Sequence, residues 1–108
     1  MKRILIVSNT PFFGSGEQFI VSILSSLENA YFIVLNPYLY SKLPNSKKVL
    51  FSSKHQRIQL KQIKGMIKKW DIDIVLLNGG RSIFFTPFLG DVKKIIYRHT
   101  TNAYVKPI

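Results

Sequence analysis

The chain has 108 residues, 46% of them hydrophobic, and a net charge of +11 from sixteen Lys and Arg against five Asp and Glu. This length fits one domain, and the apolar content is too high for a disordered chain. No apolar run is long enough for a membrane-spanning helix, and Ile4–Val7 is too short for a signal peptide, so we expect a cytoplasmic protein. The basic balance favours an anionic partner, and the lack of cysteine excludes disulfides and thiolate metal sites.

Short apolar runs alternate with amphipathic segments along the chain. The runs predict strands over Arg3–Ser8, Tyr31–Leu35, Lys47–Ser52, Ile72–Leu77 and Lys94–Arg98. Helical spacing predicts helices from about Gly16 to Asn29, from about His55 to Trp70 and, briefly, over Ser82–Leu89. Asn36–Ser46 contains two prolines and is expected to be a loop.

This alternation predicts an α/β fold: a Rossmann-like, doubly wound parallel sheet of about five strands with helices on both faces. With the strand order 3-2-1-4-5, the switch point lies between the first and fourth strands, and ligands bind there at the carboxyl ends of the strands. Three loops meet at that edge, namely Asn9–Gly16, Asn78–Ser82 and His99–Asn102.

Gly14-Ser15-Gly16 lies immediately before the first helix, where backbone N–H groups and the helix dipole favour an anion. Ser15 and Gln18 have the spacing of a capping box, and Glu17 in the first turn suits the positive helix end. A dinucleotide fingerprint is disfavoured because Phe19 replaces the third glycine, and no P-loop motif is present. On its own, the glycine run is equally typical of a flexible strand-to-helix connection.

Three segments in succession carry a family pattern: Arg3–Ser8 with the loop ending in Gly16-Glu17, then Asp73–Gly79, then Ile95–His99. They resemble three segments of family 4 glycosyltransferases of the GT-B type. The first is similar to that family's first strand and Gly-Gly-x-Glu loop. The second is similar to its Asp-x-Val strand with an Asn or His in the following turn, and the third to its strand that ends in a His. The segments cover nearly the whole chain in the family's order. Ser15 departs from the second glycine, and Arg98 departs from the apolar residue before the His.

The resemblance implies the N-terminal, acceptor-side domain of an enzyme that transfers a sugar, of hexosyl type, from a nucleotide-sugar donor in polysaccharide or glycolipid synthesis. It implies that the C-terminal donor-binding domain is missing from these 108 residues, so that the chain alone is inactive. No cofactor or metal is implied. By position, the resemblance makes His99 catalytic, assigns Gly14, Ser15, Gly16 and Glu17 to the donor-phosphate loop, and places Asn78, Gly79 and Arg81 on the acceptor side.

The second helix also has a basic face. Nine basic residues and no acidic one occur between Lys42 and Lys69. At 100° per residue, four of them fall within an arc of roughly 60°, namely Arg57, Lys61, Lys64 and Lys68. Such an arc is usually a solvated helix face, but it also suits an anionic lipid surface, which would place the protein at the inner face of the membrane.

Other functions remain open from the sequence. The main alternative to the enzyme is a free-standing basic module that binds anionic membrane or nucleic acid. The aromatic residues mostly fall in buried strands and not beside the basic residues, where they could stack on bases. No nucleic-acid partner is therefore expected. A phospho-acceptor domain is disfavoured, because no cluster of acidic residues follows the first predicted strand. A lone His such as His99 is more often structural than catalytic, and His55 has no neighbouring acid that would suggest a metal site.

Overall fold

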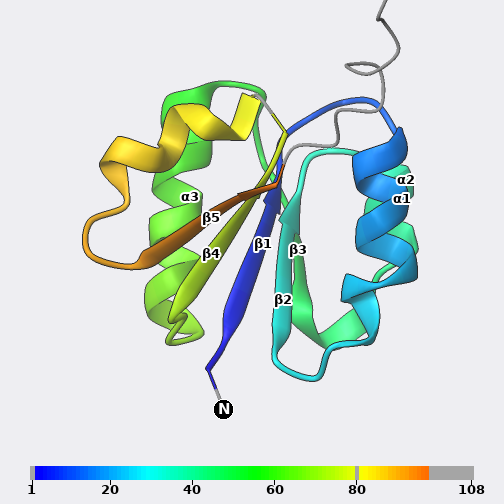
Figure 1. Ribbon diagram of the computed structural model, residues 1–108. Coiled ribbons are helices and arrows are strands. Elements are labelled where there is room, and N and C mark those ends of the chain that lie inside the picture. The colour runs from blue at the N-terminus through cyan, green and yellow to red at the C-terminus, as the bar shows by residue number, and fades with distance from the viewer. Residues whose placement is uncertain (1, 80, 98–108) are drawn as a thin grey trace, which may run out of the picture.

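A computed structural model describes residues 2–79 and 81–97 of the chain (Figure 1). Its strands are β1 (Ile4–Ser8), β2 (Ala30–Val34), β3 (Lys48–Leu50), β4 (Ile74–Asn78) and β5 (Lys93–Tyr97). The α-helices are α1 (Ser15–Ser22), α2 (Pro37–Ser41) and α3 (Gln56–Lys69), and the 3₁₀ helices are η1 (Leu24–Ser26), η2 (Asn45–Lys47) and η3 (Arg81–Phe88).

The five strands form one sheet in the order β3-β2-β1-β4-β5, and every neighbouring pair is parallel. β1 is central, with Leu5 in register with Tyr31 of β2 and Val75 of β4. The predicted fold class is therefore confirmed, and the observed strand order is the one for which the switch point was placed between the first and fourth strands. Because β1 connects toward β2 on one side and β4 lies on the other, the switch point falls between β1 and β4.

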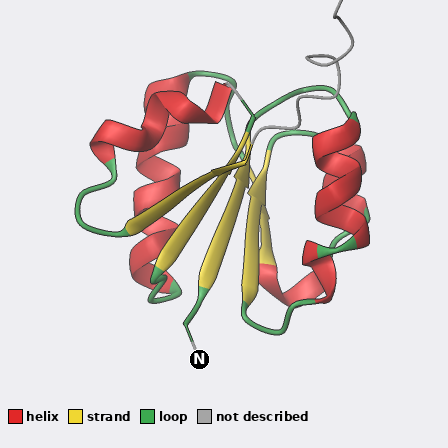
Figure 2. Cartoon of the chain, viewed as in Figure 1, coloured by secondary structure: helices red, strands yellow, loops and turns green. Residues whose placement is uncertain are grey.

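Helices cover both faces of the sheet, and each face has its own core (Figure 2). On one face α3 and η3 pack over Leu5, Val7 and Leu77, with Ile63 fully buried beneath α3. On the other face α1, η1 and α2 pack over Ile6 and the residues of β2 that point the same way. Since successive strand residues face opposite sides, a residue's position in its strand decides which helix layer it meets.

Two local predictions are corrected by the structure. Asn36–Ser46 is not a plain loop but contains α2 and η2. Asn36 caps α2 by accepting hydrogen bonds from the Tyr38 and Leu39 amides at 2.7 and 3.3 Å, while Pro37 occupies the first turn, where its missing N–H costs nothing. The first helix ends at Ser22 and not near Asn29, and its turns carry serine hydroxyls that bond backbone carbonyls one turn back, a pattern that weakens helices.

The start of α1 also differs from the expected capping box. The N-cap is Gly14, and Glu17, not Gln18, supplies the reciprocal side chain: its Oε1 accepts the Gly14 N–H at 2.6 Å. Ser15 is already the first helical residue, so its hydroxyl lies one position too late to cap. The helix therefore begins one residue earlier than the Ser15–Gln18 spacing indicates.

The last two elements of the described chain are η3 and β5. Pro87 is accommodated within η3, which is 3₁₀ rather than α-helical over all its residues. β5 is an edge strand of the described sheet, and both Ile95 and Ile96 are more than 40% exposed. Within the described residues, no helix is both long and apolar enough to cross a membrane.

Candidate functional site

The carboxyl edge of the sheet brings together two of the three predicted site loops, those that follow β1 and β4. The third, His99–Asn102, lies outside the described residues, and with it the predicted catalytic His99. The loop after β1 is held at its middle by Asn36, whose Nδ2 donates to the Pro11 carbonyl at 2.8 Å. The β1 loop is therefore anchored to the end of β2 before it enters α1.

Glu17 is the centre of a buried hydrogen-bond network at this edge. Only 6% of its surface is exposed, and its two carboxylate oxygens have different partners. Oε1 accepts the Gly14 N–H at 2.6 Å, while Oε2 accepts from Asn78 Nδ2 at 2.8 Å. The same Nδ2 lies 3.2 Å from Ser8 Oγ, so Asn78 joins the ends of β1 and β4 to the first turn of α1. The predicted loop residue Glu17 and the predicted acceptor residue Asn78 are thus direct partners.

Gly16 is required by the closeness of this packing. A Cβ built on Gly16 would lie 2.7 Å from Asn78 Oδ1, closer than real side chains approach. Asn78 is only 4% exposed and already bonded at its nitrogen, so it has little room to retreat. Gly79, the next residue, forms the turn after β4 with φ of +86° and donates its N–H to the Tyr97 carbonyl at 2.8 Å. Gly16 is therefore needed for close packing, whereas Gly79 is needed for its positive φ.

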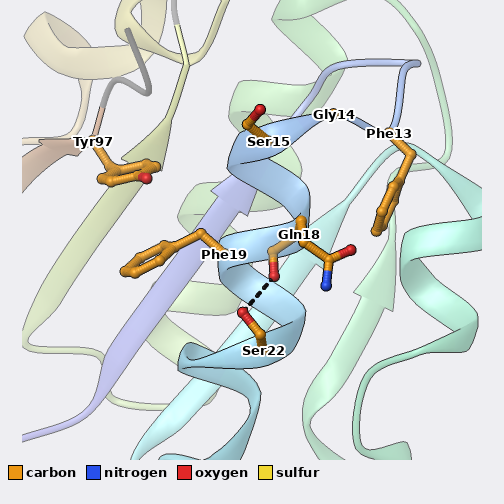
Figure 3. Close-up of a pocket in the computed structure, with 7 residues that line it drawn as sticks. All are labelled: Phe13, Gly14, Ser15, Gln18, Phe19, Ser22 and Tyr97. Atoms are coloured by element: carbon orange, nitrogen blue, oxygen red, sulfur yellow. Dashed lines mark hydrogen bonds between the residues drawn. The ribbon is translucent and has the colours of Figure 1, made fainter. Parts of the chain in front are cut away.

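An open groove of about 560 Å³ runs along the exposed side of the glycine loop and α1 (Figure 3). Gly14 and Ser15 form its upper part, and the stacked rings of Phe19 and Tyr97, 4.6 Å apart, form one wall. Figure 3 shows Ser15 at the start of α1 with the Phe19 side chain directed toward Tyr97 of β5. The groove therefore offers backbone and hydroxyl groups beside an aromatic wall, which is a combination that suits a sugar or a nucleotide.

Arg81 does not join this groove. It begins η3, on the α3 face of the sheet, and lines a separate polar cavity with Asn9 and Gln59. The residues predicted as one site therefore divide between the two faces: the glycine loop and Asn78 belong to the α1 face, and Arg81 belongs to the α3 face. The alternation of side chains in an extended chain has the same effect here: Ser8, the last residue of β1, bonds Asn78, whereas the next residue, Asn9, bonds Gln59 of α3.

Sequence reasoning missed the buried amide of Gln59, which is 1% exposed. Its Oε1 accepts from Asn9 Nδ2 at 3.1 Å, and its Nε2 donates to the Ser53 carbonyl at 2.9 Å. Asn9 Oδ1 in turn accepts from the Ser82 hydroxyl at 3.0 Å. A signal existed, because Gln59 lies four residues before the core residue Ile63 and is the polar member of that helix face.

The basic face of α3 is exposed as predicted, and the apolar face with Leu60, Ile63, Ile67 and Trp70 packs on the sheet. The four basic residues of that arc are Arg57, Lys61, Lys64 and Lys68, and all of them are exposed. Ile58, which is 45% exposed, lies beside three of them in a shallow depression of about 280 Å³.

The acidic residues are unevenly placed. Glu28, Asp71, Asp73 and Asp91 all precede strands and so lie at the amino edge of the sheet, opposite the glycine loop. Glu17 is the one acid near the carboxyl edge in the described part of the chain, and it is buried and bonded. In residues 2–79 and 81–97, no three His, Cys, Asp or Glu side chains gather in a way that could hold a metal ion.

Comparison with known proteins adds no identification. No family model matches the chain, and no curated protein and no solved structure matches it at a significant level. The resemblance to family 4 glycosyltransferases therefore stays a prediction from the motifs, and the geometry of the carboxyl edge is what bears on function.

Proposed function

We propose that this chain is the acceptor-side, Rossmann-like part of a glycosyltransferase, which transfers a sugar from a nucleotide-sugar donor when a second, donor-binding domain faces it. The observation that carries the proposal is the glycine loop at the carboxyl edge of a parallel sheet, fixed by a buried Glu in the first turn of α1. In this arrangement the loop shape is set before any ligand arrives, as positioning catalysis requires.

Each part of the groove would have a defined role in the complete enzyme. In the complete enzyme, the Ser15 N–H beside the groove, which Glu17 does not accept, would donate to a leaving diphosphate and stabilise its charge. Glu17 is a positioning residue, because its carboxylate accepts hydrogen bonds from Gly14 and Asn78 and does not line the groove. The aromatic wall of Phe19 and Tyr97 suits stacking against a sugar ring or a base.

The first test is the nucleotide sequence that follows codon 108 in the gene. We expect a second Rossmann-like domain, either in frame or one frameshift away. A stop codon followed by unrelated sequence, together with no separate chain that restores sugar transfer, would contradict the proposal.

The second test uses the complete enzyme with Gly14 changed. Gly14→Leu should fold, because a Cβ at Gly14 meets only Glu17 Oε1, at 3.5 Å, while the longer side chain enters the groove. We expect release of nucleoside diphosphate from the donor to fall at least about tenfold, the scale of one lost charge-stabilising contact. Gly65→Leu is the matched control, since no atom lies within 4 Å of a Cβ at Gly65 on α3. Equal activity of both variants would count against the glycine loop.

The second candidate function is a basic module that docks on anionic membrane, and the exposed arc of four cations on α3 favours it. Near an anionic surface each Lys contributes about 1 kcal/mol, so Lys61→Gln with Lys64→Gln should weaken vesicle binding roughly 30-fold at low salt. Lys2→Gln with Lys93→Gln removes the same charge from the amino edge and should have a much smaller effect. Strong salt-dependent binding to arbitrary DNA would instead indicate a nucleic-acid partner.

A further inference from the structure

The polar cavity on the α3 face has a composition different from that of the glycine-loop groove. Its volume is about 500 Å³, and it lies between the end of β1, the start of η3 and the first turn of α3. The lining residues are Asn9, Lys54, His55, Gln56, Gln59 and Arg81. None of these is apolar and none is acidic, which is unusual because most small-molecule sites are largely apolar.

The rim of this cavity is cationic. Lys54 and Arg81 are exposed and come from segments far apart in the chain, one before α3 and one after β4. Within residues 2–79 and 81–97 neither side chain has a hydrogen-bonding or ion-pair partner. The nearest strand ends carry no exposed carboxylate, because the acids other than Glu17 precede strands at the opposite edge of the sheet. Two uncompensated charges therefore converge on one opening, where an anion would relieve their mutual repulsion.

Asn9 and Gln59 are the two buried residues of the cavity lining, and their hydrogen bonds fix the orientation of both amides. The Ser53 carbonyl can only accept, so Gln59 must present its nitrogen to it and its oxygen to Asn9. Asn9 must then present Nδ2 to Gln59, which leaves its Oδ1 to the Ser82 hydroxyl. Each amide nitrogen uses one hydrogen in these bonds and keeps a second, so both buried side chains retain a spare N–H.

The start of α3 contributes a third set of donors. His55 is the N-cap, but its side chain makes no capping hydrogen bond, and the first turn of α3 contains no acidic residue. The first-turn N–H groups and the positive end of the helix dipole thus stay uncompensated beside Lys54. At α1, by contrast, a buried carboxylate already occupies the corresponding position.

We propose that this cavity binds a phosphate monoester, with Arg81 and Lys54 holding the phosphate at the rim and the spare amide hydrogens of Asn9 and Gln59 meeting oxygens at the floor. A dianionic phosphate suits two cations and several N–H donors, and Arg offers it paired N–H groups. A cavity of this volume exceeds what phosphate alone fills, so the ester carries a small polar body, such as a sugar. This inference does not depend on the glycosyltransferase proposal, because it uses neither the glycine loop nor a second domain.

The experiment titrates the ¹⁵N-labelled 108-residue chain with inorganic phosphate, glucose 1-phosphate and glucose, followed by NMR. Signals of the Gln56–Gln59 amides and of the Asn9 and Gln59 side chains should shift with both phosphates and not with glucose. Lys54→Gln with Arg81→Gln should raise Kd at least about tenfold, the scale of one lost charge-assisted hydrogen bond. The control variant, Lys2→Gln with Lys93→Gln, removes the same charge from the amino edge of the sheet and should change Kd less than twofold.

The source of the phosphate is tested in parallel with vesicles of phosphatidylcholine, with and without phosphatidic acid. Shifts with soluble phosphates assign the site to a free phosphorylated molecule. Binding only to phosphatidic acid vesicles, lost in the Lys54 and Arg81 variant and kept in the control variant, assigns it to a lipid headgroup. The proposal is overturned if glucose shifts the same signals, if both variants weaken binding equally, or if neither soluble phosphate nor vesicles affect the cavity.

Discussion

Two of the helices that begin at the carboxyl edge, α1 and α3, have opposite starts. At α1 a buried carboxylate of the first turn accepts the N-cap N–H and bonds Asn78 on β4, so the N-cap amide is satisfied and the helix start is fixed to the sheet. At α3 the N-cap His55 makes no side-chain bond, and the neighbouring side chains are cationic. The N-terminus of α1 is thus held rigidly by the protein itself, whereas the N-terminus of α3 leaves its positive charge available to a ligand.

This difference separates two uses of the same structural feature. A helix start attracts anions only as far as the protein itself does not supply one. At α1 the supplied anion stabilises the fold and shapes the glycine loop, whereas at α3 the buried amides of Asn9 and Gln59 fix the geometry and the charge is left open. The four predictions below are ordered from the largest expected effect to the smallest.

Glu17→Ala should have the largest effect. It removes the acceptor of two hydrogen bonds and leaves the buried Asn78 amide without its shorter contact, at 2.8 Å. We expect a loss of about 3 kcal/mol in the free energy of unfolding. Chemical denaturation measures it, with the exposed Glu28→Ala as control. Equal, small effects of both variants would mean that α1 is not locked by this carboxylate.

Gln59→Ala should destabilise the protein by about 2 kcal/mol, because the Ser53 carbonyl and Asn9 Nδ2 both lose a partner in a buried setting. Gln56→Ala, three residues earlier on the exposed side of α3, should change stability by less than about 0.5 kcal/mol. Thermal unfolding of the two variants checks the contrast. If Gln59→Ala is as stable as the control, the network does not organise the α3 end.

Gly16→Ala and Gly65→Ala should change stability in opposite directions. A methyl group at Gly16 meets Asn78 Oδ1 at 2.7 Å, so overpacking of about 1–3 kcal/mol exceeds the helical gain of about 1 kcal/mol. At Gly65, inside α3, nothing opposes that gain, and the protein should become about 0.5–1 kcal/mol more stable. Denaturant midpoints decide between the two, and stabilisation by Gly16→Ala would show that Asn78 is free to move.

His55→Asn and His55→Asp complete the comparison by giving α3 the side-chain cap that it lacks. Both should raise stability by about 0.5–1 kcal/mol through a hydrogen bond to a first-turn N–H. Only the carboxylate should also weaken phosphate binding, because it places a negative charge where the ligand is proposed to lie. Loss of binding in both variants would instead indicate that the imidazole itself holds the ligand.

Much of the fold was predictable from local patterns. β1, β2 and β4 appear as apolar runs of the right length, and their alternation with helices requires a parallel sheet with right-handed crossovers. Helix α2 (Pro37–Ser41) was missed because two prolines normally signal a loop, although Pro37 at the first helical position behind an Asn cap is compatible with a helix start.

The candidate site was predictable only in part. The glycine loop and its Glu were visible in the sequence, but Glu17 was expected to support the loop without any sign of Asn78, which lies 61 residues away. Arg81 was grouped with Asn78 because both follow the predicted strand Ile72–Leu77, whereas Asn78 ends β4 and bonds Glu17 of α1, and Arg81 begins η3 on the α3 face. Gln59 was passed over because a single polar residue in an amphipathic helix is common.

The sequence by itself determined that strands and helices alternate into a parallel sheet covered on both faces, because this follows from periodicity and from the handedness of the crossovers. The strand order, which the sequence argument assumed, then sets the carboxyl edge at which the loops after β1 and β4 meet. Only the tertiary structure decided which residues meet at that edge. Glu17 with Asn78, and Asn9 with Gln59 and Ser82, are pairs created by sheet register and strand alternation. Those contacts join distant segments, and their geometry exists only once both helix layers have packed on the sheet.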